Sequence, residues 1–252
     1  MVKRVGSLVC LFIFSLAVLP AAAQGWWIDV NFAGATSNED EVASAFVGSI
    51  YGEIGGLAAA YNKQERGAEF DFGGGYMFTP VVGLGVSITG QAHQTTAGLA
   101  ISVPSPYFFN DIGSATGVTE PLDRAEGGVH IQAMINATPN SDRLRLRVFG
   151  GPSFLRVEQD VVSDIRYTQT VSPFFRGNIV RVTGFDRQTV RGDGVGYHVG
   201  ADVSYFFSRV FGVGGVFKYS KAKVEIDDPL SEESYGLTLG GPAFGGGVRF
   251  RF

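Results

Sequence analysis

Residues 194–207 read GVGYHVGADVSYFF, and their apolar side chains fall on every second position. One parity carries valine, alanine, tyrosine and phenylalanine, whereas the other carries glycines together with His198, Asp202 and Ser204. Alternation with a period of 2 predicts a β-strand whose two faces meet different surroundings. The run is also longer than the roughly 9–11 tilted residues with which a β-strand crosses a bilayer.

Runs of the same kind recur along the chain. They lie at Trp26–Ala33, Glu69–Thr79, Val82–His93, Glu126–Asn136, Arg143–Phe154, Val210–Val224 and Gly240–Phe252. Together with the first run they predict an all-β fold, an antiparallel transmembrane β-barrel of eight strands. Beyond Gly150-Gly151-Pro152 the apolar parity changes to include Leu155 and Val157, which predicts a β-bulge there.

A soluble sandwich or lipocalin-like barrel would alternate as well, so the choice depends on the glycines and the aromatic residues. The chain has 36 Gly, 21 Phe and 9 Tyr. In a soluble fold the phenylalanines would share a core and the glycines would face water. In a membrane barrel the glycines and charges line a narrow interior, and aromatic residues face lipid near the short turns, as the pairs Trp26-Trp27 and Tyr76/Phe78 would do. The sequence favours the membrane barrel.

The connections between the runs alternate in length. Short ones lie at 79–81, 137–142 and 208–209, and long ones at 34–67, 94–125, 160–193 and 225–239. Outer-membrane barrels have short periplasmic turns and long extracellular loops, so we expect the N-terminus and the C-terminus of the barrel domain on the periplasmic side. The apolar segment Phe46–Tyr61 offers a further hairpin, which gives ten strands as the alternative.

Residues 1–23 have the features of a signal peptide. Lys3 and Arg4 precede an apolar stretch, and Ala21-Ala22-Ala23 predicts cleavage before Gln24. The predicted barrel domain is therefore 24–252. Cleavage removes the single cysteine and leaves 18 basic against 24 acidic side chains, a formal charge of −6. This balance argues against nucleic acid as a partner.

The last residues, Gly247-Val248-Arg249-Phe250-Arg251-Phe252, place a glycine, an aromatic residue and a final Phe at alternating spacing. With Gly73–Phe78, Gly200–Tyr205 and Gly212–Gly215, the chain resembles the OmpA/OmpX- and opacity-type family of small eight-stranded outer membrane β-barrels. The resemblance implies that Gly247, Phe250 and Phe252 form the assembly signal, with Phe252 read by the outer-membrane assembly machinery. It also implies a place in the cell outer membrane, in contact with its lipid.

The resemblance implies a role in envelope structure, or in surface recognition or adhesion through extracellular loops. The alternative is a narrow channel for small or apolar molecules, and a more remote one is a lipid-modifying enzyme. We expect no enzyme, because His93, His130 and His198 lie on the interior parity without a neighbouring His-Ser dipeptide or paired acids. Their scattered spacing also predicts no metal site, and Gly192-x-Gly194-x-Gly196 precedes no helix, so no cofactor is expected.

Two groups of residues are the candidate sites. Charged side chains on the interior parity predict an ion-pair network in the lumen, formed by Asp29, Arg145, Arg147, Asp202, Arg249 and Arg251. Because an eight-stranded barrel holds little more than its own side chains, the interior should be filled. Two long loops carry aromatic residues with which an extracellular protein or lipid would be contacted: Tyr107, Phe108, Phe109, Phe174 and Phe175. We expect these loops to meet, with Ile179–Val182 extending a strand above the membrane.

Overall fold

The computed structural model describes residues 25–35, 43–62, 67–231 and 234–252, and the predicted signal peptide lies outside them. In these residues no helix has the length and apolar character needed to span a membrane. The strands are β1 (Trp26–Ala35), β2 (Ala43–Ile50), β3 (Glu53–Tyr61), β4 (Gly67–Met77), β5 (Val82–Thr95), β6 (Ala97–Pro104), β7 (Ile112–Val118), β8 (Leu122–Asn136), β9 (Leu144–Val171), β10 (Asn178–Phe206), β11 (Phe211–Asp227), β12 (Ser234–Leu239) and β13 (Pro242–Arg251).

Eight antiparallel strands of the described residues close into a barrel. The order is β1, β4, β5, β8, β9, β10, β11 and β13, and β13 pairs back with β1. β12 pairs with β11 beyond the point where β13 begins. β12 and β13 therefore occupy one strand position of the barrel wall and are separated at Gly240 and Gly241. Gly240 has a φ of 87°, which a residue with a side chain rarely adopts. The predicted eight-stranded antiparallel barrel is confirmed.

The ten-stranded alternative is wrong. The segment 46–61 does form a hairpin, β2–β3, but β3 pairs with β6 in a separate sheet of order β2-β3-β6-β7. The hairpin finds its partner in another loop, because the barrel is already closed and has no free edge to accept it.

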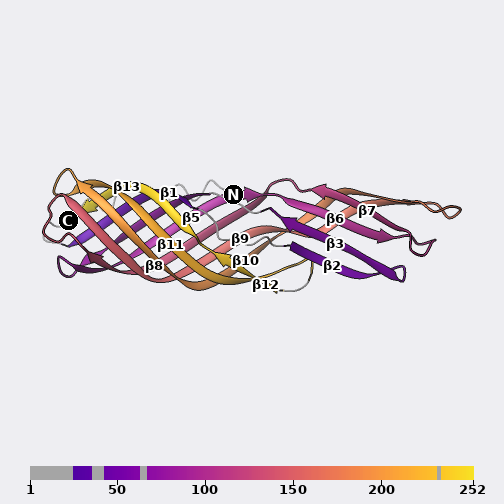
Figure 1. The fold of residues 1–252 in the computed structure, drawn as a ribbon, viewed down its shortest axis with the longest axis horizontal. Coiled ribbons are helices and arrows are strands. Elements are labelled where there is room, and N and C mark those ends of the chain that lie inside the picture. Colours follow the sequence, from indigo (N-terminus) through magenta and orange to yellow (C-terminus); the bar gives the residue numbers. More distant parts are fainter. Residues whose placement is uncertain (1–24, 36–42, 63–66, 232–233) are drawn as a thin grey trace.

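Above the barrel, the long loops form a second folded region, which we call the extension. It consists of the four-stranded sheet and the continuation of the β9–β10 hairpin, and it lies at the opposite end of the long axis from the C-terminus (Figure 1). β7 lies against β10, where a side chain at Gly113 would overlap Val180. Ile101 and Val103 of β6 and Val180 of β10 form a small buried core between them.

An apolar belt surrounds the barrel. Its outward side chains run from Leu144 to Phe154 on β9 and from Val195 to Tyr205 on β10, and most of them are exposed. Directly above it the outward positions become charged, with Arg156 beside Asp193. On β9 the belt covers residues 144–154, which matches the roughly 9–11 residues with which a tilted strand crosses a bilayer.

Two details of the predicted wall are corrected. β9 pairs with β10 in one register through Gly150–Pro152, and its register with β8 is the same before and after these residues, so the β-bulge predicted there is wrong. Leu155 and Val157 point inward like Ser153, because the register does not shift. They are apolar because the interior changes from polar to apolar at this level. Trp26 and Tyr76 belong to the aromatic girdle at the short turns, whereas Trp27 is buried in the lumen, because adjacent residues of a strand face opposite sides.

Candidate functional site

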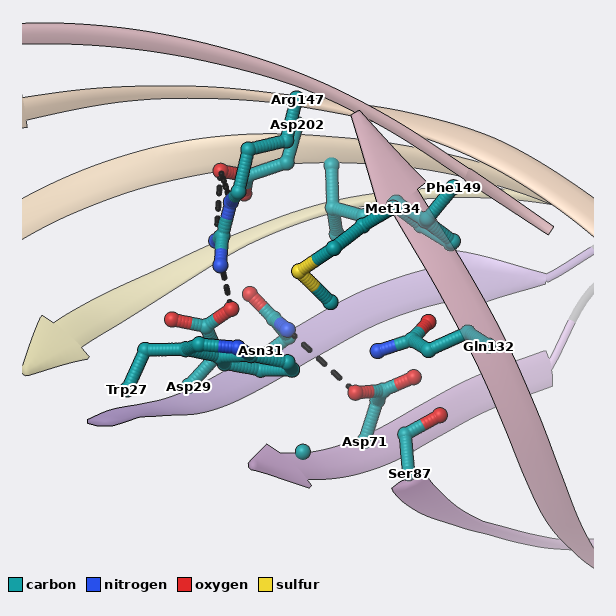
Figure 2. A pocket seen from close by; sticks show the side chains of 12 residues that line it. Trp27, Asp29, Asn31, Asp71, Ser87, Gln132, Met134, Arg147, Phe149 and Asp202 are labelled. Carbon is teal, nitrogen blue, oxygen red and sulfur yellow. Dashed lines mark hydrogen bonds and ion pairs between the residues drawn. The ribbon is translucent and has the colours of Figure 1, made fainter. Parts of the chain in front are cut away.

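The lower lumen contains a buried ion cluster supplied by four strands. Arg147 of β9 donates to Asp29 at 2.6 Å and to Asp202 at 2.8 Å, and Figure 2 shows it between the two carboxylates. Arg249 of β13 binds Asp202, with Nε at 2.9 Å, and lies 3.6 Å from Asp29. The register explains the arrangement, because Asp29 pairs with Arg249 and Asp202 pairs with Arg147 across neighbouring strands. Two positive and two negative groups thus share one site.

Other side chains of the lumen fill the space around this ion cluster. The Arg147 guanidinium lies over the Trp27 ring, 4.9 Å from its centre, and Asn31 donates to Asp71 at 3.4 Å. Beside them lies a cavity of about 20 Å³ (Figure 2). That volume is close to the space of a single water molecule. The lower lumen is therefore occupied by protein side chains across its width.

Arg145 and Arg251 were predicted in the same network, but the structure places them below it. Both guanidinium groups face the Phe206 ring, at 5.3 and 4.1 Å from its centre. Arg251 also donates to the backbone carbonyls of Arg209 and Asp142. Arg251 lies at a strand end, where the short turns offer it these carbonyl oxygens as hydrogen-bond acceptors.

A second polar layer lies above the first, and sequence reasoning did not find its pairings. Lys218 of β11 reaches Glu69 at 2.6 Å and Asp71 at 2.9 Å, both on β4. Interior parity marks each of these residues as facing the lumen. β4 and β11 are not neighbours in the ring, so their contact depends on the barrel diameter, which alternation does not specify.

The two central histidines join the same layer. Ser153 bridges His130 at 2.8 Å and His198 at 3.0 Å, and Thr89 lies 3.0 Å from the other nitrogen of His130. The imidazole rings are 4.9 Å apart. Ser153 is 0% exposed, so this chain of side chains lies in the middle of the barrel. Figure 2 views the neighbouring layer, in which Gln132 and Ser87 continue the polar interior.

An apolar cluster fills the upper lumen and continues into the extension. Leu155 and Val157 of β9 meet Leu122, Val224 and Leu239 from the barrel wall. The same cluster includes residues of the extension, among them Ala59, Tyr61, Ala97, Leu99 and Ile165. Tyr61 accepts a hydrogen bond from the Val162 amide at 2.8 Å, and burial raises the pKa of its hydroxyl. Barrel and extension therefore share one continuous core.

At the far end of the extension, two of the predicted loops meet. Gly177 donates its amide to Asp111 at 3.3 Å, and Asn178 donates its side chain to the Asp111 carbonyl at 3.0 Å. Arg176 donates to the carbonyl of Phe109 at 3.4 Å. The turn between β6 and β7 is thereby fixed to the turn between β9 and β10.

A third turn joins them, which the sequence analysis did not anticipate. In the β2–β3 turn Tyr51 is exposed, and Glu53 accepts a hydrogen bond from the Asn110 amide at 2.8 Å. We call the exposed aromatic side chains of the three turns the aromatic tip: Tyr51, Tyr107, Phe109, Phe174 and Phe175. Phe174 is 89% exposed and Phe175 is 68% exposed. Phe108, the remaining predicted loop residue, is half-buried.

The predicted assembly-signal residues lie along the β1–β13 seam. A side chain at Gly247 would overlap the carbonyl of Val30, so glycine permits close approach of the two strands. Phe250 faces outward beside Phe211, with ring centres 5.7 Å apart. Phe252 hydrogen-bonds with β1 and its neighbour, to Trp26 at 2.9 Å and from Gly25 at 2.8 Å.

Charged pairs lie on the outer wall directly above the belt. Arg156 contacts Asp193 at 2.6 Å, and Arg191 contacts Glu158 at 3.0 Å. The hydrogen bond from Arg156 lowers the pKa of Asp193, and the one from Arg191 lowers the pKa of Glu158. Nearby, His93 lines an open pocket of about 550 Å³, where partial burial lowers its pKa.

Comparison with known proteins places the chain in a family. No curated protein gives a significant match. Among solved structures it is similar to OprG from Pseudomonas aeruginosa, at 10% identity and a TM-score of 0.49, with 91% of this chain and 96% of that chain covered. It is also similar to Neisserial surface protein A, at 12% identity and a TM-score of 0.47, with coverages of 90% and 97%. For Ail of Yersinia pestis the identity is 13%, the TM-score 0.41 and the coverages 90% and 99%.

The family model described as "Outer membrane protein beta-barrel domain" matches residues 6–252. That range includes every strand of the barrel and of the extension. The chain therefore belongs to the outer membrane protein β-barrel domain family, and its place is the outer membrane of the cell.

Proposed function

We propose that this protein acts in recognition or adhesion at the cell surface, through the aromatic tip of its extension. The single observation that carries the proposal is the convergence of three separate hairpin turns at the end farthest from the C-terminus (Figure 1). Each of these turns exposes aromatic side chains. Exposed aromatic residues are costly in water and are enriched where a protein binds a partner.

The support beneath the tip is suited to this role. β9 and β10 each continue as one long strand from the barrel wall to the tip, and their pairing shifts register twice, between Val182 and Gly184 and between Asp186 and Arg187. Apolar side chains of β6 and β10 form a small buried core between this hairpin and the four-stranded sheet. Binding residues concentrate on loops that a rigid scaffold holds in place. The extension therefore presents the aromatic side chains from a fixed framework.

The interior of the barrel offers less support for passage of solutes or for catalysis. The ion cluster of Asp29, Arg147, Asp202 and Arg249 lies across the lower lumen, and the apolar cluster lies across the upper lumen. The chain His130–Ser153–His198 is enclosed between them. A substrate would have to displace one of these layers to reach it, so we propose a role that is not enzymatic.

Adherence of cells that express the protein tests this proposal. Wild type is compared with Phe174→Ser/Phe175→Ser on plates coated with phosphatidylcholine, with gelatin or with nothing. The variant should assemble normally, as judged by a barrel band that migrates differently when unboiled, and should lose adherence to at least one coating.

The matched control is Val47→Ser/Val118→Ser, which alters two exposed apolar side chains of the extension away from the tip. It should adhere like wild type. Equal adherence of the tip variant and wild type on every coating would contradict the proposal.

A further inference from the structure

We infer that the aromatic tip binds the surface of a second lipid bilayer, one that faces the cell, by inserting its exposed aromatic side chains. The inference rests on the proposed surface function and names the class of partner. It is carried by the form of the tip, its polar groups, its charges and its distance from the protein's own membrane.

The tip is made of three neighbouring turns that hydrogen-bond to one another. Phe174 and Phe175 are consecutive at the outermost turn, and Phe109, Tyr107 and Tyr51 project from two turns beside it. A protein partner would need a matching hollow for each ring, whereas the interfacial region of a bilayer accommodates aromatic side chains of any arrangement. Tyrosine and tryptophan are enriched at that depth, and phenylalanine is common on the apolar face of interfacial segments.

Polar groups in and next to the turns form hydrogen bonds with other groups of the protein. The amide of Phe174 donates to the Ser172 hydroxyl at 3.2 Å, and the amide of Tyr107 donates to the Ser105 hydroxyl at 3.3 Å. Gln169 and Asn178 also bond to each other, at 2.9 Å. Because a backbone amide without a partner is costly in an apolar medium, these bonds reduce the cost of insertion.

The charges nearest to the rings are held against the protein. Arg176 donates to the Phe109 carbonyl, Asp111 accepts from Gly177, and Glu53 accepts from Asn110. One positive and two negative groups do not make a strongly charged surface. The tip therefore fits a neutral, zwitterionic lipid surface, for which hydrophobic insertion supplies the affinity.

The length of the extension decides which membrane is reached. The apolar belt ends on β9 at Phe154, and the strand continues to Val171. At about 3.3 Å per residue this is roughly 55 Å of strand, somewhat less in height because strands tilt. The tip therefore lies far above the protein's own lipid and can meet only a membrane that faces it.

Flotation with vesicles tests the inference. Full-length protein in nanodiscs is mixed with phosphatidylcholine vesicles, and vesicle-bound protein is measured after flotation. Wild type and Val47→Ser/Val118→Ser should float with the vesicles. Phe174→Ser/Phe175→Ser should lower the partition coefficient by about tenfold or more, because two large apolar side chains no longer leave water.

A depth measurement keeps the test independent of folding. The mature chain has no cysteine, so Phe175→Cys and Val118→Cys each take one fluorescent label. Lipid brominated on its acyl chains should quench the label at position 175 and leave the one at 118 unchanged.

The two failures are distinguishable. Loss of cell adherence in the tip variant, with no vesicle flotation of wild type, would overturn lipid as the partner and leave a protein ligand for the same tip. Equal adherence of variant and wild type would remove the surface function together with this inference. Quenching at both labelled positions would mean non-specific association and would also overturn it.

Discussion

Asp202 is the residue on which the lower ion cluster depends, because it binds Arg147 and Arg249 and also accepts a hydrogen bond from Ser204. We expect Asp202→Asn to leave two buried guanidinium groups with one carboxylate between them. Removing one partner of a buried pair costs about 3–5 kcal/mol. Urea unfolding of the protein in lipid should therefore show a large loss of stability. The control is Asp193→Asn, whose pair with Arg156 is exposed; equal losses in both variants would show that the cluster contributes nothing special.

His93 lies above the belt, and partial burial lowers its pKa from the ordinary 6.5, with Glu126 acting in the opposite direction. As pH falls below that ordinary value, the unfolded chain gains a proton at this side chain and the folded chain does not, so stability falls. We expect the loss of stability between about pH 7.5 and about pH 5 to be smaller in His93→Gln than in wild type. Chemical denaturation at both pH values measures it, and an NMR midpoint for His93 above 6.5 would contradict the assignment.

At the scale of the strand, glycines determine how closely two neighbouring strands of the barrel approach each other. A side chain at Gly196 of β10 would overlap the carbonyl of Lys221 on β11, whereas one at Gly90 meets nothing within 4 Å. Gly196→Ala should therefore reduce the yield of the heat-modifiable, closed barrel, and Gly90→Ala should not. Electrophoresis of unboiled membrane samples measures the closed fraction. Normal closure in Gly196→Ala would mean that the wall tolerates a wider spacing than the structure has.

Strand patterns in the sequence are sufficient for the barrel wall and insufficient for the extension. Alternation identifies each transmembrane side, because one face meets lipid and the other meets a polar lumen. It fails at Leu155, because the interior becomes apolar there while the outward positions become charged from Arg156 onward, so the apolar parity switches and imitates a β-bulge. The apolar character of residues 46–61 indicates the β2–β3 hairpin but not its partner β6, because pairing between two loops depends on contacts between residues far apart in the sequence.

For the whole molecule, the sequence predicts the closed ring and which residues face inward, but it does not predict contacts across the lumen. Asp29 and Arg249 are neighbours by register once the first and last strands pair, so sequence reasoning places them together. Lys218 and Glu69 come from sides that are not adjacent, and only the diameter of the barrel brings them within 2.6 Å. The place of Tyr51 in the aromatic tip is likewise not predictable from the sequence. It depends on the packing of three loops, which brings the β2–β3 turn against the β6–β7 turn.

We propose that the molecule works at its outer surface and not through its lumen. Planar-bilayer recording of the purified, refolded protein tests it most directly. We expect no reproducible single-channel steps, because the buried ion pairs of Arg147 and Arg249 and the apolar cluster around Val157 both lie across the lumen. Large, reproducible steps from wild-type protein would contradict the account and place the function in the lumen.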